Sequence, residues 1–286
     1  MDFVCVGVRI PKCGSTSLSN SLKFAFADRR IFHLPHTLDL EGGGSFLQML
    51  RFRRTQARNL FARYRTIDIG EACGFIGTWA LDGDLILGGH IDFPSVRNRL
   101  GRPVKMITLF RNPVARCRSE YNYCRAAYRA KAPLTRLDTP LKHRAAGLFS
   151  FQGYLDFLLE RSETYGNLSA RYVGWDGREN LDRFFARDVF HSGILENSTA
   201  FVRGLACKLD MPLIFPHDNK SKANAATIGT LERAKIERLY AHDFELYEWQ
   251  LDHLDRGHER ATSRTRLRSP IRSQAMAPFW SAPDVS

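Results

Sequence analysis

Short apolar runs, each followed by a turn and then by helical spacing, constrain the fold of this chain most. The first run covers residues 3–8, and a turn at residues 11–14 separates it from Leu18, Leu22 and Phe26, which recur every four residues. The same order of strand and helix recurs through residue 255. Alternating strands and helices predict an α/β fold in which a parallel sheet carries helices on both faces.

The expected elements are short strands and longer helices within one domain. The strands are expected at residues 3–8, 85–87, 104–110 and 189–195, and the helices at residues 14–27, 113–128, 178–187, 197–209 and 230–254. We assign residues 1–255 to a single domain. Residues 256–286 are basic and rich in serine, and because they lack apolar periodicity we expect a disordered tail.

The charge balance points to an anionic partner. Lys and Arg number 42 against 30 Asp and Glu, which gives a formal charge of +12. Nucleic acid, a membrane surface, or an anionic cofactor or substrate would each suit that charge.

The cysteines are scattered without a C-x-x-C pair, so we expect free thiols in a reducing compartment and no metal site. No apolar run is long enough to span a membrane and no signal peptide is recognisable, so the expected location is the cytoplasm.

The sequence PKCGSTSL, directly after the first expected strand, has the features of an anion site. Small residues let the backbone approach a ligand, and the N–H groups at the start of a helix point toward negative charge. Gly14, Ser15, Thr16 and Ser17 suit this role. A plain turn with a Ser or Thr cap is the structural alternative.

Two other functions also compete for this sequence. A P-loop kinase needs Gly-Lys followed by Ser or Thr, and the chain has no such tripeptide. The apolar run ITLF ends in Arg111 rather than in a magnesium-binding aspartate, for which Asp82 is a weak substitute. A basic nucleic-acid-binding protein is the non-enzymatic alternative, and no helix-turn-helix, zinc or RNA-binding signature supports it.

The PKCGSTSL stretch resembles the 5′-phosphosulfate loop of sulfotransferases that use 3′-phosphoadenosine-5′-phosphosulfate as sulfonate donor. In that family a lysine precedes the small residues, as Lys12 does here. The resemblance implies a P-loop-like sulfotransferase fold, with Lys12 acting in catalysis beside the bridging oxygen that leaves with the phosphate, and with no metal. The residues implied in donor binding are Lys12, Cys13, Gly14, Ser15, Thr16 and Ser17.

The segment LFRNPVARCRSEYNY resembles the 3′-phosphate site of the same family. Arg111 and Ser119 match the arginine at the strand end and the serine eight positions later on the following helix. An arginine offers a planar fork to a phosphate, and a serine offers a hydroxyl. Asn112 can cap that helix and Pro113 can open it. Two such motifs in this order, each after an expected strand, favour the sulfotransferase interpretation more than either motif alone.

The catalytic base is expected at His90. Proton removal from an acceptor hydroxyl near neutral pH suits a histidine. The stretch LGGHIDF resembles the HGHxxF stretch of uronyl 2-O-sulfotransferases, with Gly88 standing where the first histidine would be. That resemblance implies a carbohydrate acceptor. A structural role is the alternative for His90, and Asp92 or Glu71 would then be the base.

Two further features concern the donor and the acceptor. The segment FPHDNKSKAN is similar to a family loop that closes over the nucleotide, which implies that Lys220 and Ser221 contact the 3′-phosphate. Two basic segments would suit an anionic glycan, although a solvated helix face accounts for any single arginine. Their residues are Arg51, Arg53, Arg54, Arg58, Arg63 and Arg65 in one segment, and Arg125, Arg129, Lys131 and Arg136 in the other.

Overall fold

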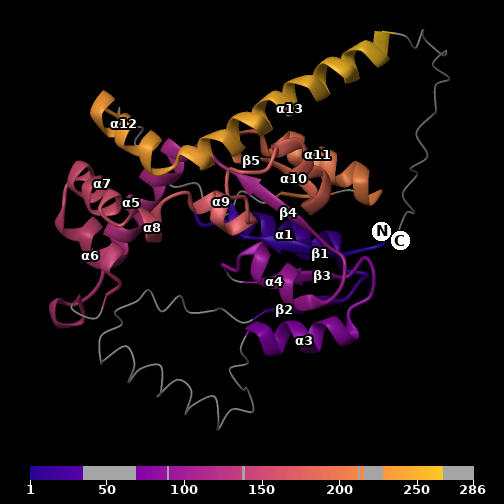
Figure 1. The fold of residues 1–286 in the computed structure, drawn as a ribbon, viewed down its shortest axis with the longest axis horizontal. Helices are drawn as coiled ribbons and strands as arrows, with labels where there is room; N and C mark the ends of the chain where they lie inside the picture. The colour runs from indigo at the N-terminus through magenta and orange to yellow at the C-terminus, as the bar shows by residue number, and fades with distance from the viewer. Residues whose placement is uncertain (35–68, 89, 137–138, 212, 216–227, 267–286) are drawn as a thin grey trace, which may run out of the picture.

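The computed structural model describes residues 1–34, 69–88, 90–136, 139–211, 213–215 and 228–266. Its centre is a five-stranded sheet in the order β2-β3-β1-β4-β5, in which every neighbouring pair is parallel (Figure 1). The strands are β1 (Val4–Val8), β2 (Ile31–His33), β3 (Leu85–Leu87), β4 (Val104–Phe110) and β5 (Val189–Ile194). The expected strands are confirmed, and β2 is an additional edge strand.

One face of the sheet is covered by α1 (Ser15–Ala25) and α11 (Ser198–Leu209). Alternate strand residues, among them Cys5 of β1 and Ile107 and Leu109 of β4, pack against these helices, as the two-residue period of a strand requires. Gly7 lets α1 approach the sheet closely, because a Cβ atom there would lie 2.8 Å from Leu22 Cδ1.

The opposite face is covered by α3 (Ile69–Trp79), α4 (Phe93–Leu100), α9 (Leu168–Val173), α10 (Leu181–Asp188) and α13 (Ala241–Arg266). Val4, Val6 and Val8 of β1 pack on this side, together with Met106 of β4. The sheet therefore lies between two helical layers, and the predicted α/β fold with helices on both faces is confirmed. None of the described helices is both long enough and apolar enough to cross a membrane.

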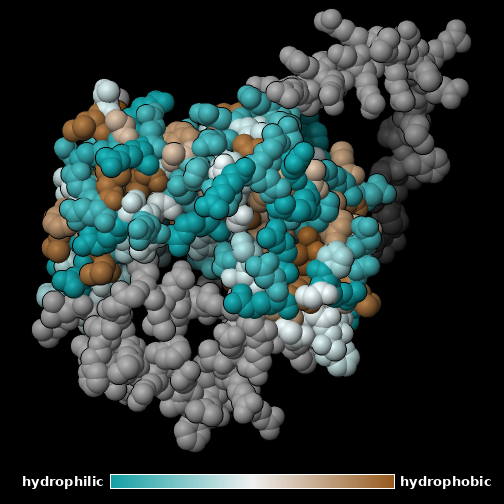
Figure 2. All heavy atoms as spheres, viewed as in Figure 1, coloured by the Kyte–Doolittle hydropathy of each residue, from teal (hydrophilic) through white to brown (hydrophobic). Residues whose placement is uncertain are grey.

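A second group of helices packs beside the sheet, at the left of Figure 1. It contains α5 (Pro113–Arg129), the 3₁₀ turn η1 (Pro133–Arg136), α6 (Leu141–Leu148), α7 (Phe151–Leu159), α8 (Ser162–Tyr165) and α12 (Thr230–Leu239). Its own core includes Tyr121, Tyr154 and Leu158. Figure 2 shows apolar side chains on the outer surface of this group as well, and Leu148 and Phe149 are among its exposed residues.

A buried charge network joins this group to α13. Arg116 is fully buried, lies 3.3 Å from the carboxylate of Asp243, and covers the ring of Tyr240 at 4.3 Å. Glu120 lies 4.0 Å from Arg116 and 2.9 Å from Lys142 Nζ. Burial alone would lower the pKa of Arg116, but Tyr240, Asp243 and Glu120 raise it above its ordinary value. The arginine therefore stays charged, and it anchors α5 beside the sheet.

The helix expected at residues 230–254 is wrong in one respect, because the chain breaks at Tyr240 into α12 and α13. Asn167 satisfies the backbone at this break. Its N–H donates to the Leu239 carbonyl (3.1 Å), and its side-chain oxygen accepts from the N–H of His242 (2.9 Å). A partner so distant in sequence cannot be inferred from helical periodicity.

The end of α13 also differs from expectation. The helix continues to Arg266, so residues 256–266 are helical rather than disordered. Extending an existing helix costs much less than nucleating one, and this basic segment contains Ala, Glu and Arg, which favour helix. Residues 267–286 lie outside the described part of the chain, and the domain boundary at residue 255 stays a prediction.

The strand order brings three sequence-distant loops together. β3, β1 and β4 are neighbours, so the segments that follow Leu87, Val8 and Phe110 all leave the carboxyl edge of the sheet. The connection after β1 crosses one face through α1, whereas those after β3 and β4 cross the other face through α4 and α10. Ligands in open α/β sheets bind where neighbouring connections diverge in this way, so this edge is the expected place for a site.

Candidate functional site

The loop after β1 has an unusual backbone. Lys12 and Gly14 adopt positive φ values of 65° and 71°. That conformation favours glycine and is uncommon for a residue with a side chain. At Gly14 a Cβ atom would also lie 2.6 Å from Leu195 Cδ1, in the 3₁₀ turn η2 (Leu195–Asn197) that follows β5. The sequence PKCG therefore forms a tight turn that starts α1 directly after β1.

The amino end of α1 has no side-chain cap. Gly14 is the N-cap residue, and the first turn contains no acidic side chain. The N–H of Leu18 donates to the Gly14 carbonyl (2.9 Å) and begins the helical hydrogen bonding. The N–H groups of Ser15, Thr16 and Ser17 precede that point, where a helix leaves its donors without helical partners. These donors and the helix dipole together favour a bound anion.

Cys13 stabilises the conformation of this loop. Its side chain lies in the core beneath the sheet, and burial raises the pKa of the thiol to about 12. Its N–H donates to the Ile10 carbonyl (3.3 Å). Of the residues predicted to bind the donor, Cys13 therefore has neither a thiolate nor a spare N–H to offer.

The ammonium group of Lys12 lies against an aromatic ring. Its Nζ atom is 4.3 Å from the centre of the Tyr123 ring on α5. Burial lowers the pKa of Lys12 from its ordinary value, and Arg111 lowers it further, while Cys124 and Glu120 act in the opposite direction. The loop thus presents a half-buried cation at the carboxyl edge of the sheet.

Arg111 joins the two predicted anion sites. Its Nη1 atom donates to the Lys12 carbonyl at 3.0 Å. The contact follows from the sheet, because β4 and β1 are adjacent and parallel.

Asn112 and Pro113 have the predicted roles at the start of α5. Pro113 is the first helical residue, and the side-chain oxygen of Asn112 accepts from two N–H groups of the first turn, at 3.0 and 3.2 Å.

Ser119 lies on the face of α5 that meets this loop. It is about 9 Å along the helix axis from Pro113, at the usual rise of about 1.5 Å per residue. Tyr123 follows Ser119 by one helical turn and therefore shares its face. The Tyr123 ring contacts Lys12, so the half-buried Ser119 lies on the same side of α5 as that contact.

His90 lies beside the loop, in the segment after β3. Its Nδ1 atom is 2.8 Å from the carbonyl oxygen of Arg9. A carbonyl only accepts, so Nδ1 carries the proton, and in the neutral ring the basic lone pair is on Nε2. The ring also meets Tyr172 edge-on, with centroids 6.4 Å apart. This tautomer is the one that a general base acting through Nε2 requires.

Arg9 is a residue of this edge that sequence reasoning missed. Its Nε atom donates to the Ser15 carbonyl (3.1 Å) and its Nη1 atom to the Gly88 carbonyl (3.3 Å). Since its own carbonyl holds His90, Arg9 ties the end of β1 to both neighbouring segments. Burial lowers the pKa of Arg9. The one signal in the sequence is a charged residue that directly follows a buried strand.

The remaining candidates are either used by the fold or lie outside the described residues. Asp92 caps α4, because its carboxylate accepts from the N–H and the hydroxyl of Ser95, both at 2.8 Å. This carboxylate is therefore committed to the start of the helix. Outside the described part of the chain lie Lys220, Ser221, the basic segment at residues 51–65 and the side chain of Glu71.

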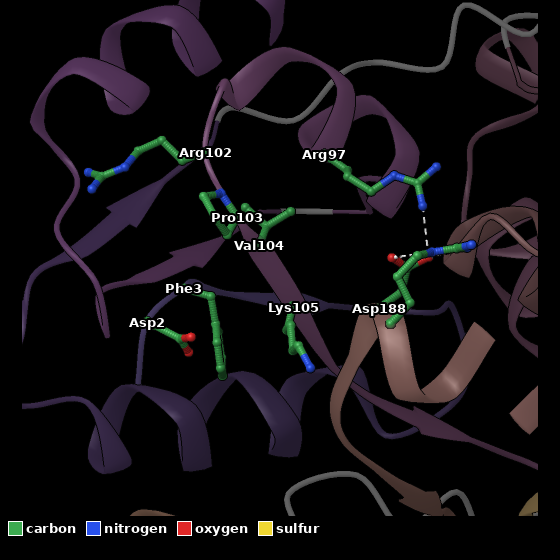
Figure 3. A pocket seen from close by; sticks show the side chains of 9 residues that line it. Asp2, Phe3, Arg97, Arg102, Pro103, Val104, Lys105 and Asp188 are labelled. Atoms are coloured by element: carbon green, nitrogen blue, oxygen red, sulfur yellow. Dashed lines mark hydrogen bonds and ion pairs between the residues drawn. The ribbon is translucent and has the colours of Figure 1, made fainter. Parts of the chain in front are cut away.

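A groove of about 680 Å³ lies at the opposite, amino edge of the sheet (Figure 3). Four cationic residues line it: Arg97, Arg102, Lys105 and Arg187. Arg97 and Arg187 both contact the carboxylate of Asp188, at 2.7 and 2.8 Å. Lys105 donates to a backbone carbonyl at 3.1 Å, and Arg102 lies 3.5 Å from an aspartate. Arg97, Arg102 and Arg187 are therefore paired with carboxylates, and Lys105 is bonded to a backbone carbonyl.

The solved structures that are similar to this chain at low sequence identity include two sulfotransferases. One is a sulfotransferase from Alicyclobacillus acidocaldarius, with 17% identity and a TM-score of 0.41 over 85% of this chain and 92% of that one. The other is mouse sulfotransferase SULT7A1 complexed with PAP, with 14% identity and a TM-score of 0.39 over 83% of this chain and 64% of the mouse protein. No family model and no curated protein matches the chain.

Proposed function

We propose that the chain is a sulfotransferase that moves a sulfonate group from 3′-phosphoadenosine-5′-phosphosulfate to an acceptor hydroxyl. The observation that carries the proposal is the hydrogen bond from Arg111 to the Lys12 carbonyl, at 3.0 Å. It joins the two motifs that the sequence predicts to bind the two charged ends of this donor. One anion motif suits many ligands, whereas two motifs in contact suit a nucleotide that is charged at both its 5′ and 3′ positions.

Each motif binds a different charged group of the donor. The N–H groups of residues 15–17, at the uncapped start of α1, bind the 5′-phosphosulfate. Arg111 and Ser119 bind the 3′-phosphate, for which a guanidinium fork and a hydroxyl are suitable donors. Lys220 and Ser221 are proposed to add contacts to the same phosphate.

Lys12 and His90 carry the chemistry in this proposal. His90 Nε2 takes the proton from the acceptor hydroxyl while the acceptor oxygen attacks sulfur. The bond from sulfur to the bridging oxygen breaks, and its electron pair stays on the phosphate. Lys12 and the α1 amides stabilise the negative charge that develops there. Cys13 and Gly14 shape the turn that places these donors.

The acceptor is proposed to be a carbohydrate or glycoconjugate, and an anionic glycan in particular. The basic residues Arg125, Arg129, Lys131 and Arg136 follow Tyr123 along the end of α5 and into η1. Among the residues that the structure describes, the hydrogen bonds of Arg125, Lys131 and Arg136 go to hydroxyls and backbone carbonyls rather than to carboxylates. Their charge is thus left to attract an anion.

The two competing functions make different demands. A kinase would need ATP and Mg²⁺. A nucleic-acid-binding protein would lose affinity for nucleic acid steeply as the salt concentration rises.

The proposed location is the cytoplasm, because all six cysteines are free thiols and only Cys207 is exposed, which suits a reducing compartment.

Transfer of labelled sulfonate under single-turnover conditions tests the proposal. The acceptors are a uronic-acid polysaccharide, a neutral polysaccharide and a small phenol, each without Mg²⁺, and ATP with Mg²⁺ is run in parallel. We expect transfer to the uronic-acid polysaccharide. His90→Ala should slow it by about 10²–10⁴, while His33→Ala, an exposed histidine at the end of β2, should not. No transfer to any of the hydroxyls, or phosphorylation by ATP instead, would overturn the proposal.

A further inference from the structure

Tyr123 is an exposed aromatic residue on the face of α5 that meets the loop. It is 56% exposed, and the Nζ atom of Lys12 lies 4.3 Å from the centre of its ring. Tyr121, two residues earlier, is buried in the core of the second helical group, and its hydroxyl donates to the Phe149 carbonyl (3.0 Å). The two tyrosines therefore differ in role. Tyr121 packs the helical group, and Tyr123 meets a cation.

Lys12 is held at two points by the segment that runs from β4 into α5. Arg111 fixes its backbone through the carbonyl, and the Tyr123 ring lies under its ammonium group. A lysine side chain has many rotamers in solution, and fixing one of them costs conformational entropy. Attraction between the ammonium group and the ring face offsets part of that cost. The two contacts together define where the cation lies.

The ring of Tyr123 also contacts a histidine. His143 of α6 meets it nearly edge-on, with an interplanar angle of 67° and centroids 6.1 Å apart. Burial lowers the pKa of His143, and Lys142 and Lys131 lower it further, so the imidazole is neutral near pH 7. A neutral ring supports Tyr123 without repelling the nearby ammonium group. Lys12 and His143 thus both contact the Tyr123 ring.

We propose that Tyr123 is a positioning residue for Lys12, whose ammonium group it holds over its ring at the carboxyl edge of the sheet. This rests on the proposed function, in which Lys12 stabilises the leaving phosphate. The contact uses the ring face and not the hydroxyl, so phenylalanine should replace tyrosine and leucine should not. Because Arg111 and Ser119 anchor the nucleotide, loss of the ring should change turnover more than donor affinity.

Chemical labelling of Lys12 tests the contact without any ligand. The acetylation rate of Lys12 in the full chain is measured by mass spectrometry against that of exposed Lys23 on α1. The chains are wild type, Tyr123→Phe, Tyr123→Leu and Phe24→Leu, the last replacing an aromatic that is 52% exposed on α1. We expect Tyr123→Leu alone to raise the rate, by about two- to fivefold, as an exposed cation–π contact allows. Equal rates in all four chains would overturn the proposal, and so would a Tyr123→Phe chain that labels like Tyr123→Leu.

Kinetics then separate positioning from binding. Tyr123→Leu should lower kcat by about tenfold and change the Kd for adenosine 3′,5′-bisphosphate (PAP) by less than about twofold. Tyr123→Phe should keep both at wild-type values. An unchanged kcat in a Tyr123→Leu chain with a more reactive Lys12 would overturn the positioning role. If the wild-type chain transfers no sulfonate, the proposed function fails, and the labelling experiment still decides whether the ring holds Lys12.

Discussion

The two edges of the central sheet carry similar basic side chains and use them differently. At the amino edge, Arg97 and Arg187 share the carboxylate of Asp188 in the groove of Figure 3. At the carboxyl edge, the contacts of Lys12 and Arg111 within the described part of the chain are with an aromatic ring and a backbone carbonyl, not with carboxylates. Positive charge that is matched within the protein stabilises the fold, whereas unmatched charge is left for an anionic ligand.

The same contrast holds among helices that start at the carboxyl edge. Asp92 caps α4 and Asn112 caps α5, but Gly14 has no side chain to cap α1. The amino end of α1 therefore keeps donors that its neighbours have already used. The net charge of +12 cannot locate a site, but the pairing of each cation and the capping of each helix can.

Removal of the Lys12 ammonium group should have the largest effect. Lys12→Ala is expected to slow sulfonate transfer in a single turnover by about 10²–10³, as loss of one charge-stabilising donor does in other enzymes. Lys105→Ala, which removes a lysine from the amino edge, is the matched control and should transfer at the wild-type rate. If Lys12→Ala stayed within about threefold of wild type, the two edges would not differ in catalysis.

Arg97→Gln should cost stability rather than activity. The buried Asp188 would lose one of its two arginine partners, so the free energy of unfolding in urea should fall by about 1–3 kcal/mol. Arg99→Gln is the control on the same helix, because its Nη1 atom donates within α4, to the Ser95 carbonyl. Reduced nucleotide affinity in Arg97→Gln would contradict the separation of the two edges.

Arg111 and Lys12 should act as a unit, although the sequence motifs suggest one binding role and one catalytic role. Arg111→Ala also releases the Lys12 carbonyl, so a double-mutant cycle on kcat/KM should show a coupling of about 0.5–3 kcal/mol. Arg97 and Lys12, at opposite edges, should be additive to within about 0.5 kcal/mol. Full additivity of the Arg111 and Lys12 changes would mean that their contact has no role in transfer.

The smallest effect expected is a shift in the titration of Lys12. Burial lowers the pKa of Lys12, so its ammonium group should deprotonate below the ordinary lysine value of about 10.4. Sulfonate transfer should fall as pH rises through that range. NMR of ¹³C-methylated lysines measures the pKa, and Lys12→Arg identifies the signal. Bound PAP should raise the pKa, because its negative charge favours the ammonium form. A signal that titrates at or above the ordinary value would contradict the partly buried position of Lys12.

Features that depend on neighbouring residues were predicted from the sequence. Apolar runs identified β1, β3 and β4, which are buried along most of their length, and β5, which is buried at half of its positions. The start of α5 was predicted because the cap and the first helical residue, Asn112 and Pro113, are adjacent in sequence. The small residues of PKCGSTS likewise indicated a tight turn before α1.

Features that depend on distant contacts were missed. The break at Tyr240 needs Asn167, and the role of Arg9 appears only when the segments after β1 and β3 converge. β2 has three residues, none of them fully buried, so its apolar signal is weak. Tyr123, rather than Tyr121, contacts Lys12 because of the orientation in which α5 packs against α6 and α7. The sequence around Tyr123 does not predict this orientation.

Calorimetry with nucleotides that differ only at the 3′ position tests the central claim most directly. PAP and adenosine 5′-monophosphate are titrated into the wild-type, Arg111→Ala and Arg97→Gln chains. We predict that wild type binds PAP at least about tenfold more tightly, or about 1.4 kcal/mol. Arg111→Ala should abolish this preference and Arg97→Gln should keep it. Equal affinities for the two nucleotides in the wild-type chain, or loss of the preference in Arg97→Gln alone, would contradict a two-anion nucleotide site at the carboxyl edge.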